Sequence, residues 1–274
     1  RDSDMYEDDH DSVLVEALLA EAFRAHPLRH PVIGHRTRFA ATTPDRLRAY
    51  HAARYVSENL VLAVAGSATV AQVLESASRW FGRFPRRSPQ ARPVMPEPPG
   101  AEPRTLRLVR DVSTARGVVT WRAPGILSPD SLPMDLVAGI LGAGRSSLLW
   151  REIRERQGLV HAISASAWGV EDLGMLWISW SGEAGTDPAV VEAAIESVIQ
   201  GFLRGPVDPE AFAKVRRQAA VGMVNAQKTV HGLASRIGYA TAVARDERQA
   251  QANARQLAEV TPERLLEVAR NWIH

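Results

Sequence analysis

The sequence predicts an α+β protein made of two related α/β-sandwich domains, in which mainly antiparallel sheets carry helices on one face. Three observations lead to this fold class. The segments "ISASAW" and "LWISWS" alternate apolar and polar residues, as half-buried antiparallel strands do. Much of the remaining chain has apolar residues at helical spacing. The similar short segments "TPDRL" and "TPERL" lie near the start and the end of the chain, which favours two related halves.

The predicted first domain consists of helices and one buried strand. Residues 11–26 have apolar residues at helical spacing and predict a helix, whereas residues 27–42 are a loop with prolines and a glycine. Thr43, followed by proline and aspartate, indicates the N-terminus of a second helix. The unbroken apolar run at 59–68 predicts a buried strand, and the amphipathic segment 69–81 predicts a third helix.

A proline-rich segment separates the two predicted domains. Residues 85–103 show no hydrophobic periodicity, and this composition is typical of an extended, semi-rigid linker. We therefore assign residues 1–90 to the C-terminal part of a first domain, 91–104 to the linker, and 105–274 to a second domain.

The second domain is predicted to contain four strands and several helices. The strands lie at residues 104–111, 115–124, 159–169 and 174–183. An aliphatic helix at 130–144 separates the first pair of strands from the second. Helical segments follow the strands at 187–205, where an Asp-Pro pair caps the start, at 207–242, and at 261–273.

The stretch "GAGRSSLLWREIRERQGLVHA", residues 142–162, joins a glycine-rich turn to a short charged helix. A phosphate-binding loop would need a dinucleotide glycine pattern after a strand, or a lysine followed by Ser or Thr. Here the preceding segment reads as a helix, and no lysine is near in the sequence. We therefore expect a helix–turn–helix connection with Ser146 or Ser147 as the N-cap, and with Leu149 and Ile153 facing the core.

The composition argues against several classes of function. The formal net charge is +2, which disfavours general nucleic-acid binding. There is no cysteine, so disulfides and thiolate metal sites are excluded. No apolar run reaches the ~18 residues that indicate a membrane span, and the acidic N-terminal segment does not resemble a signal peptide. We therefore expect a cytoplasmic protein without a nucleic-acid or membrane partner.

Histidines and acidic residues offer only weak candidates for a metal site. His26, His30 and His35 lie close together, but they fall in a proline-rich loop and not on one face of a helix. We expect them to be exposed loop histidines. The acidic run at Glu7 to Asp9 is expected to be a solvated turn. The sequence contains no HExxH, HxxEH or G-x-S-x-G motif.

Taken together, these segments resemble the pitrilysin/insulinase-type metallopeptidases, the inverzincin group that includes mitochondrial processing peptidase. The stretch from "MYEDDHDS" to "NLVLAVAGSA" resembles the later part of the family's first, catalytic domain. The stretch "LGAGRSSLLWREIRERQGLVHAISA" resembles the second domain, in which "L..G..S.L...LRE..GL.Y" is the usual form. The layout of the C-terminal helices also fits, so the resemblance covers nearly the whole chain.

By this resemblance, Arg154 and His161 are candidate substrate-binding residues. In the family, an arginine on the helix after the glycine turn and a tyrosine on the next strand clamp the backbone of the substrate near the cleaved bond. Arginine suits this task because its guanidinium presents several donors in a fixed fork. Arg154 takes the arginine position, whereas His161 replaces the tyrosine. The alternative is that Arg154 is an ordinary surface charge of the segment "REIRER".

The resemblance also implies zinc as the cofactor of the family. That site needs HxxEH on a helix, with the glutamate as the base, and a downstream glutamate as the third ligand. The motif is missing from this chain, and the third-ligand position falls close to Asp2. One aspartate cannot hold zinc alone, so we predict neither a metal ligand nor a catalytic residue here, and no activity for this chain by itself.

The main functional prediction is a subunit or fragment of a zinc-dependent endopeptidase that acts on peptides or unfolded polypeptides in an enclosed chamber. The alternative is a non-catalytic partner or structural interaction subunit of the same superfamily. The first is favoured because a first domain without the zinc-motif segment would leave a sheet edge and a core face open. Either function implies a homo- or heterodimer with a related subunit. An unrelated nucleotide enzyme would be recognised by phosphate bound at residues 142–147.

Overall fold

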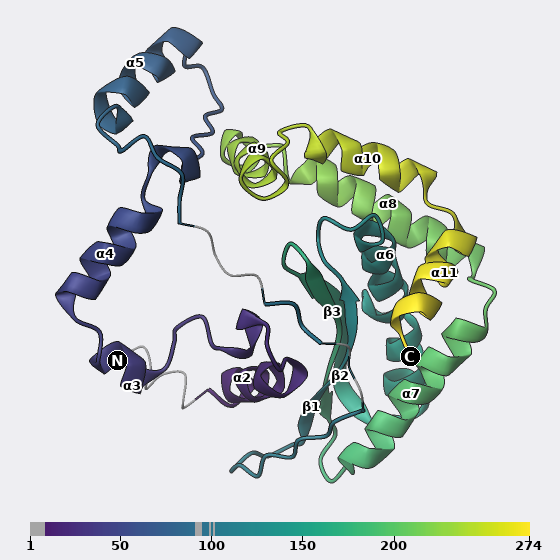
Figure 1. Ribbon diagram of the computed structural model, residues 1–274. Coiled ribbons are helices and arrows are strands. Elements are labelled where there is room, and N and C mark those ends of the chain that lie inside the picture. Colours follow the sequence, from purple (N-terminus) through teal and green to yellow (C-terminus); the bar gives the residue numbers. More distant parts are fainter. Residues whose placement is uncertain (1–8, 91–94, 99, 101) are drawn as a thin grey trace. The chain divides into compact units, whose positions relative to one another are not determined.

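The computed structural model describes residues 9–90, 95–98, 100 and 102–274 (Figure 1). Contacts within the chain define two compact units. Unit 1 comprises residues 1–60 and 69–111, and unit 2 comprises residues 61–68 and 112–274. Each unit is described by itself below.

Unit 1 is helical in its described part. Its elements, in chain order, are α2 (His10–Ala22), η1 (Pro27–Arg29), α3 (Arg36–Ala40), α4 (Pro44–Arg54), η2 (Ser57–Asn59) and α5 (Val70–Phe81). The predicted N-cap is confirmed, because the Thr43 hydroxyl accepts a hydrogen bond from Arg46 N at the start of α4. At the start of α5, Thr69 and Gln72 form a reciprocal capping box.

Unit 1 has a small core, and part of the proline-rich segment is attached to it. Phe23 and Val56 are its buried hydrophobic residues within the described range. The Glu97 carboxylate accepts three backbone hydrogen bonds, from Arg24 N at 2.7 Å, Ala25 N at 2.8 Å and His26 N at 2.7 Å. A carboxylate that satisfies several orphan N–H groups after a helix fixes that turn. The segment around Glu97 is therefore held against the end of α2.

Two of the predicted strands are wrong. Residues 59–68 and 104–111 form no strand in the structure, although both are rich in aliphatic residues. Their side chains include exposed ones, such as Leu62 at 56% and Val109 at 97%. A strand exists only where a neighbouring segment takes up its backbone hydrogen bonds. The described residues provide no such neighbour, and Ala63 instead lies beside Gly238 of helix α9 in unit 2.

Unit 2 contains a three-stranded antiparallel sheet with the order β1-β3-β2. The strands are β1 (Arg116–Pro124), β2 (Val160–Gly169) and β3 (Leu173–Gly182). They correspond to three of the four strands that the alternating pattern predicted for this region. The register pairs Thr120 with Trp177 across β1 and β3, and Ser166 with Trp177 across β2 and β3. β3 is central and contributes the buried side chains Leu176, Ile178 and Trp180 to the core.

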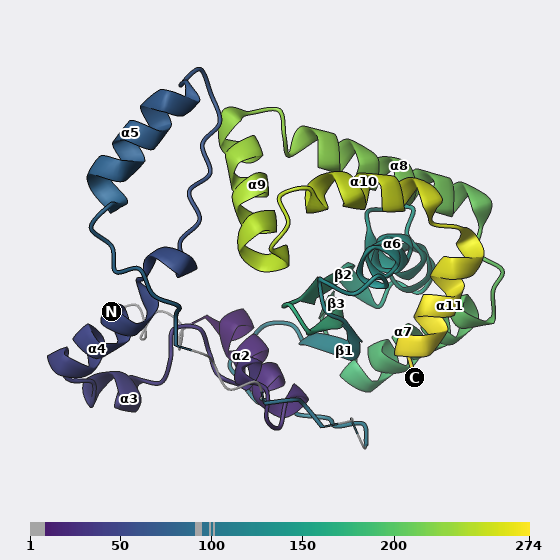
Figure 2. The ribbon, with the colours of Figure 1, turned by 45° about the horizontal axis from the view of Figure 1, so that its top comes forward.

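Helices cover one face of this sheet, which confirms the predicted fold class (Figures 1 and 2). The helices of unit 2 are α6 (Ser131–Gly142), η3 (Trp150–Arg156), α7 (Pro188–Arg204), α8 (Pro209–Asn225), α9 (Val230–Ala244), α10 (Gln249–Glu259) and α11 (Pro262–Trp272). α6 lies against β2, α11 and α7 lie against β1, and α8 and α10 pack on α6. In the described part of the chain, no helix combines the length and the apolar character needed to cross a bilayer.

The helix ends of unit 2 follow the signals in the sequence. Asp187 caps α7, which begins with a proline, and Thr261 caps α11 in the same way as Thr43 caps α4. The recurrence of "TPDRL" and "TPERL" therefore has a local cause at each site. The predicted helical stretch 207–242 is divided into α8 and α9, and α10 was not predicted at all.

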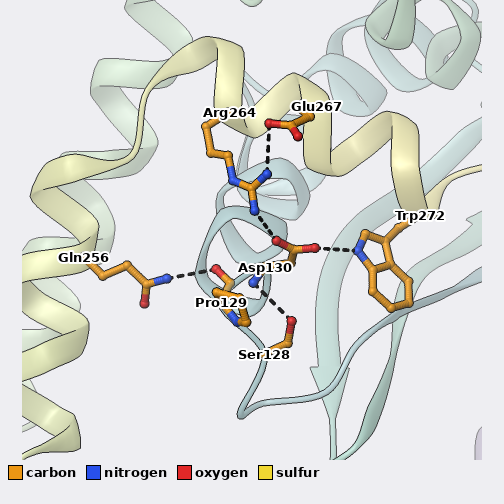
Figure 3. Close-up of polar contacts among 7 residues, drawn as sticks. All are labelled: Ser128, Pro129, Asp130, Gln256, Arg264, Glu267 and Trp272. Carbon is orange, nitrogen blue, oxygen red and sulfur yellow. Dashed lines mark hydrogen bonds and ion pairs between the residues drawn. The ribbon is translucent and has the colours of Figure 1, made fainter.

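Asp130, at the start of α6, connects that helix to the C-terminal part of the chain (Figure 3). Its carboxylate pairs with Arg264 of α11 and accepts a hydrogen bond from Trp272 Nε1 at 3.0 Å. Arg264 also pairs with Glu267 at 2.9 Å, and Gln256 Nε2 of α10 donates to Pro129 O at 2.8 Å. The Asp130 side chain is only 19% exposed. A negative charge at this position also suits the positive end of the α6 dipole.

Replacing Asp130 is expected to destabilise unit 2. Asp130→Ala removes a charge-assisted pair and leaves the indole N–H of Trp272 without an acceptor, so the free energy of unfolding should fall by about 2 kcal/mol. Asp130→Asn keeps an acceptor for Trp272 and should cost about half as much. Urea unfolding of the 274-residue chain measures both values.

Glu267→Gln is the matched control for Asp130→Ala. It removes the other, more exposed carboxylate that pairs with Arg264, and should change the free energy of unfolding by less than ~0.5 kcal/mol. Equal losses for Asp130→Ala and Glu267→Gln would show that Asp130 has no special role.

Candidate functional site

The candidate site begins where α6 ends against β2. A Cβ on Gly142 would lie 1.9 Å from Ala165 N, so the backbones approach too closely for any side chain at this position. Two residues later, Gly144 has a φ of +78°, which reverses the chain away from the helix. The glycines of the "GAG" turn therefore serve close packing and a tight turn. The segment before Gly142 is a helix, as predicted, and not the strand that a dinucleotide-binding loop requires.

A lysine closes this turn in space, although none is near in the sequence. Lys214 Nζ of α8 donates to Ser146 Oγ at 2.5 Å and to Ala143 O at 3.3 Å. The predicted N-cap role of Ser146 or Ser147 is wrong, because no side chain caps the following helix. The Ser146 hydroxyl bonds to Lys214, and Ser147 Oγ is buried without a partner among the described residues. The turn is thus fixed from α8.

The helix after the turn is a π-helix, η3, over Trp150–Arg156. Gln157 N donates to Glu152 O at 3.2 Å, five residues back, as this wider helix requires. Leu149 and Ile153 are fully buried, which confirms that they face the core. π-Helical turns occur often at functional sites.

Arg154 lies on the flank of η3 and stacks on an aromatic ring. Its guanidinium carbon is 4.2 Å from the centroid of the Trp150 ring, which is a close cation–π contact. The Trp150 ring is itself held by a hydrogen bond from Nε1 to Glu155 Oε1 at 3.2 Å. Arg154 is half-buried, and within the described residues its guanidinium has no hydrogen-bond or salt-bridge partner. This contact restrains the guanidinium and leaves its N–H groups available.

His161 lies at a β-bulge at the start of β2. The register with β3 shifts between Val160 and Ala162, so His161 is the extra residue of the bulge. Its Nδ1 is 3.0 Å from Gly182 O, and because a carbonyl can only accept, Nδ1 carries the proton. When the ring is neutral, Nε2 is then an acceptor. His161 is exposed. Arg154 and His161 lie on consecutive elements that pack together, but no hydrogen bond joins their side chains in the described part of the chain.

The residues considered for a metal do not form a ligand set. His30 and His35 are exposed and their ring nitrogens lie 3.3 Å apart, whereas His26 Nδ1 accepts from Leu28 N. Desolvation, with the nearby charges of Arg38 and Arg29 and the ring of His35, lowers the pKa of His30. Within the described ranges, no three His, Asp or Glu residues could hold a metal ion.

The acidic N-terminal candidates fall partly outside the structure. Asp9 caps α2 and accepts hydrogen bonds from Asp11 N at 3.2 Å and Ser12 Oγ at 2.6 Å. These bonds lower the pKa of its carboxyl group. Asp2, Glu7 and Asp8 lie outside the described residues.

Asp135 of α6 is an ionisable residue with a shifted pKa. It is exposed on one side, yet burial of its carboxyl group among neighbouring atoms raises its pKa to about 6. No hydrogen bond or salt bridge to Asp135 is formed by the residues that the structure describes. The sequence alone gave no reason to single out this residue.

Comparison with known proteins identifies the family. The model of the peptidase M16 inactive domain matches residues 41–219. An uncharacterized zinc protease of Mycobacterium bovis is 26% identical over an alignment of 276 positions, which covers 98% of this chain and 62% of that protein. The chain belongs to the M16 peptidase family, in the part described as the inactive domain, and the resemblance seen in the sequence is confirmed.

Solved structures show the same fold. A protease from Helicobacter pylori matches with a TM-score of 0.90 and 17% identity, over 98% of this chain and 65% of that one. A peptidase M16 inactive domain from Pseudomonas fluorescens matches with a TM-score of 0.85 and 17% identity, over 99% and 64% of the two chains. This chain thus spans less than two thirds of the length of each of these relatives.

The raised pKa of Asp135 predicts a pH-dependent effect on stability. Because the folded-state pKa lies above the ordinary value, the proton stabilises the fold below about pH 4, and this stabilisation is lost as the pH rises through about 6. Asp135→Asn cannot ionise and should therefore melt at a higher temperature than the native chain near pH 8. Near pH 4 the two melting temperatures should coincide.

Melting curves of both proteins at the two pH values test this prediction. Glu171→Gln, which removes an exposed carboxylate between β2 and β3, controls for the change in net charge. A lower melting temperature for Asp135→Asn near pH 8 would contradict the prediction.

Proposed function

We propose that this chain is a non-catalytic, polypeptide-binding part of an M16-type zinc peptidase, and that a related polypeptide carries the zinc. In this proposal residues 105–274 form the family's second, substrate-binding type of domain, residues 1–90 belong to the first, and residues 91–104 link them. The match to an inactive domain and the naming of the relatives as zinc proteases support this division of labour.

The observation that carries the proposal is the state of Arg154. Its guanidinium is oriented by Trp150 and half-buried, and it has no protein partner in the described part of the chain. An ordered arginine with free N–H groups is suited to donate hydrogen bonds to peptide carbonyl oxygens. Unfolded polypeptides present such carbonyls, because their backbone is not paired in secondary structure. His161, on the next strand, would add one donor or acceptor of different reach from the family's tyrosine.

The described residues do not form a zinc site. The described part of the chain lacks a group of three ligands, so its residues do not fit a catalytic zinc site, which needs three protein ligands and an open position. We therefore derive no step of peptide hydrolysis from this chain. The peptides that it binds would be cleaved by the related polypeptide.

A purely structural interaction subunit is the second candidate. Helices α4 and α5 favour it, because they carry exposed large apolar side chains: Leu47, Tyr50, Val70, Leu74 and Trp80. Apolar surface of this kind commonly marks contact with another polypeptide. A structural subunit would use this surface and would have no need of an available arginine at Arg154. A related subunit that covers α4 and α5 is compatible with both candidates.

Arg154→Ala is expected to weaken the binding of an unfolded polypeptide. Loss of one charge-assisted hydrogen bond, about 1.5–3 kcal/mol, corresponds to a roughly ten- to hundredfold higher Kd. The free energy of unfolding should change by at most ~1 kcal/mol, since only one half-buried cation–π contact is lost. Fluorescence anisotropy of a labelled unfolded peptide, titrated with this chain, measures the Kd.

Arg151→Ala is the matched control for this titration. Arg151 lies on the same helix and is exposed, so its removal changes the net charge equally without touching the stacked arginine. Arg154→Lys keeps the charge but loses the fork, and should bind almost as weakly as Arg154→Ala. The same Kd for native chain and Arg154→Ala, or equal losses in Arg151→Ala, would refute the clamp and favour the structural subunit.

A further inference from the structure

A small pocket lies between α6 and the ends of β1 and β2. Its volume is about 70 Å³, well above the roughly 10–15 Å³ that one water molecule needs. The residues that line it are Pro124, Ile126, Ser131, Met134, Asp135, Ala167, Trp168 and Gly169. Most of these walls are apolar. The pocket lies on unit 2 alone and is separate from η3, which carries Arg154.

Two polar residues stand out in this apolar setting. Ser131 and Asp135 are four positions apart on α6 and therefore lie on one face of the helix. Asp135 is exposed, so the pocket is accessible from solvent. An ionised carboxylate among apolar atoms is costly unless a positive group pairs with it, and no charged residue of the described chain does so. The raised pKa of Asp135 reflects this lack of compensation.

The chemistry of the missing partner follows from the pocket. A cation is required by the carboxylate, and an aliphatic stem is favoured by the apolar walls. Lysine and arginine side chains combine both, because their methylene groups lie along apolar surface while the charged end reaches a polar group. A hydrated metal ion would gain nothing from these walls, and the pocket offers it one carboxylate.

We propose that this pocket binds the basic side chain of a polypeptide, with the charged end paired to Asp135 and the stem against Met134, Ile126 and Ala167. Ser131, one helical turn before Asp135, would supply a second acceptor. The pocket would make this chain prefer polypeptides that have lysine or arginine at one position. This inference does not depend on the clamp at Arg154, and either can fail without the other.

Blocked amino acids provide direct probes of the pocket. Nα-acetyl-lysine methylamide and Nα-acetyl-arginine methylamide carry the proposed group, and Nα-acetyl-norleucine methylamide is the neutral match. The chain has five methionines, so a spectrum with labelled methionine methyl groups is simple, and Met134→Leu identifies the Met134 signal. The basic probes should shift this signal saturably at about millimolar concentration, and norleucine should not.

Variants then test whether the Asp135 carboxylate is responsible for binding of the basic probes. Asp135→Asn should weaken the binding of the basic probes roughly tenfold or more, whereas Glu171→Gln should leave their binding unchanged. The other methionine signals report whether each variant is folded, and the comparison with norleucine needs no variant at all.

Three results would overturn the inference. The first is an equal shift with norleucine, which would indicate a merely apolar pocket. The second is equal weakening by Glu171→Gln, which would indicate a general charge effect. The third is no saturable shift of the Met134 signal with either basic probe.

Discussion

The close contact between the end of α6 and β2 is the constraint on which the rest of unit 2 depends. Only a glycine at position 142 lets the helix approach Ala165 at backbone distance. That approach fixes where the "GAG" turn leaves the helix, and Lys214 then holds the turn from α8. The position of this turn sets the start of η3 and the orientation of Arg154. The opposite end of α6 is held by Asp130 through its contacts with α11 (Figure 3). With both ends fixed, the face of α6 that carries Asp135 is held against the ends of the strands.

Local signals in the sequence predicted much of the fold. Thr43 and Asp187 cap helices where the sequence predicted, because a cap depends only on neighbouring residues. Alternation identified β2 and β3 for a similar reason, since each has one face against the helices. The apolar run at 59–68 failed as a strand because strand formation depends on a partner that the run itself cannot specify. The same dependence explains the failure at 104–111.

The candidate site was predicted less completely than the fold. Arg154 and His161 were singled out through a family resemblance, and their roles remain proposals. The stacking of Arg154 on Trp150 is consistent with their spacing on one helix and could have been anticipated. Lys214 and the pocket at Asp135 could not, because they bring together residues that are far apart in the sequence. A carboxylate without a partner is recognised only when its surroundings are known.

The central claim is that this chain binds unfolded polypeptide and does not cleave it. The most direct test is to incubate the chain with a labelled unfolded peptide, with and without a zinc chelator, and to follow both anisotropy and peptide mass. We predict saturable binding that the chelator leaves unchanged, and a peptide of unaltered mass. Cleavage that the chelator abolishes would contradict the claim, as would the absence of binding.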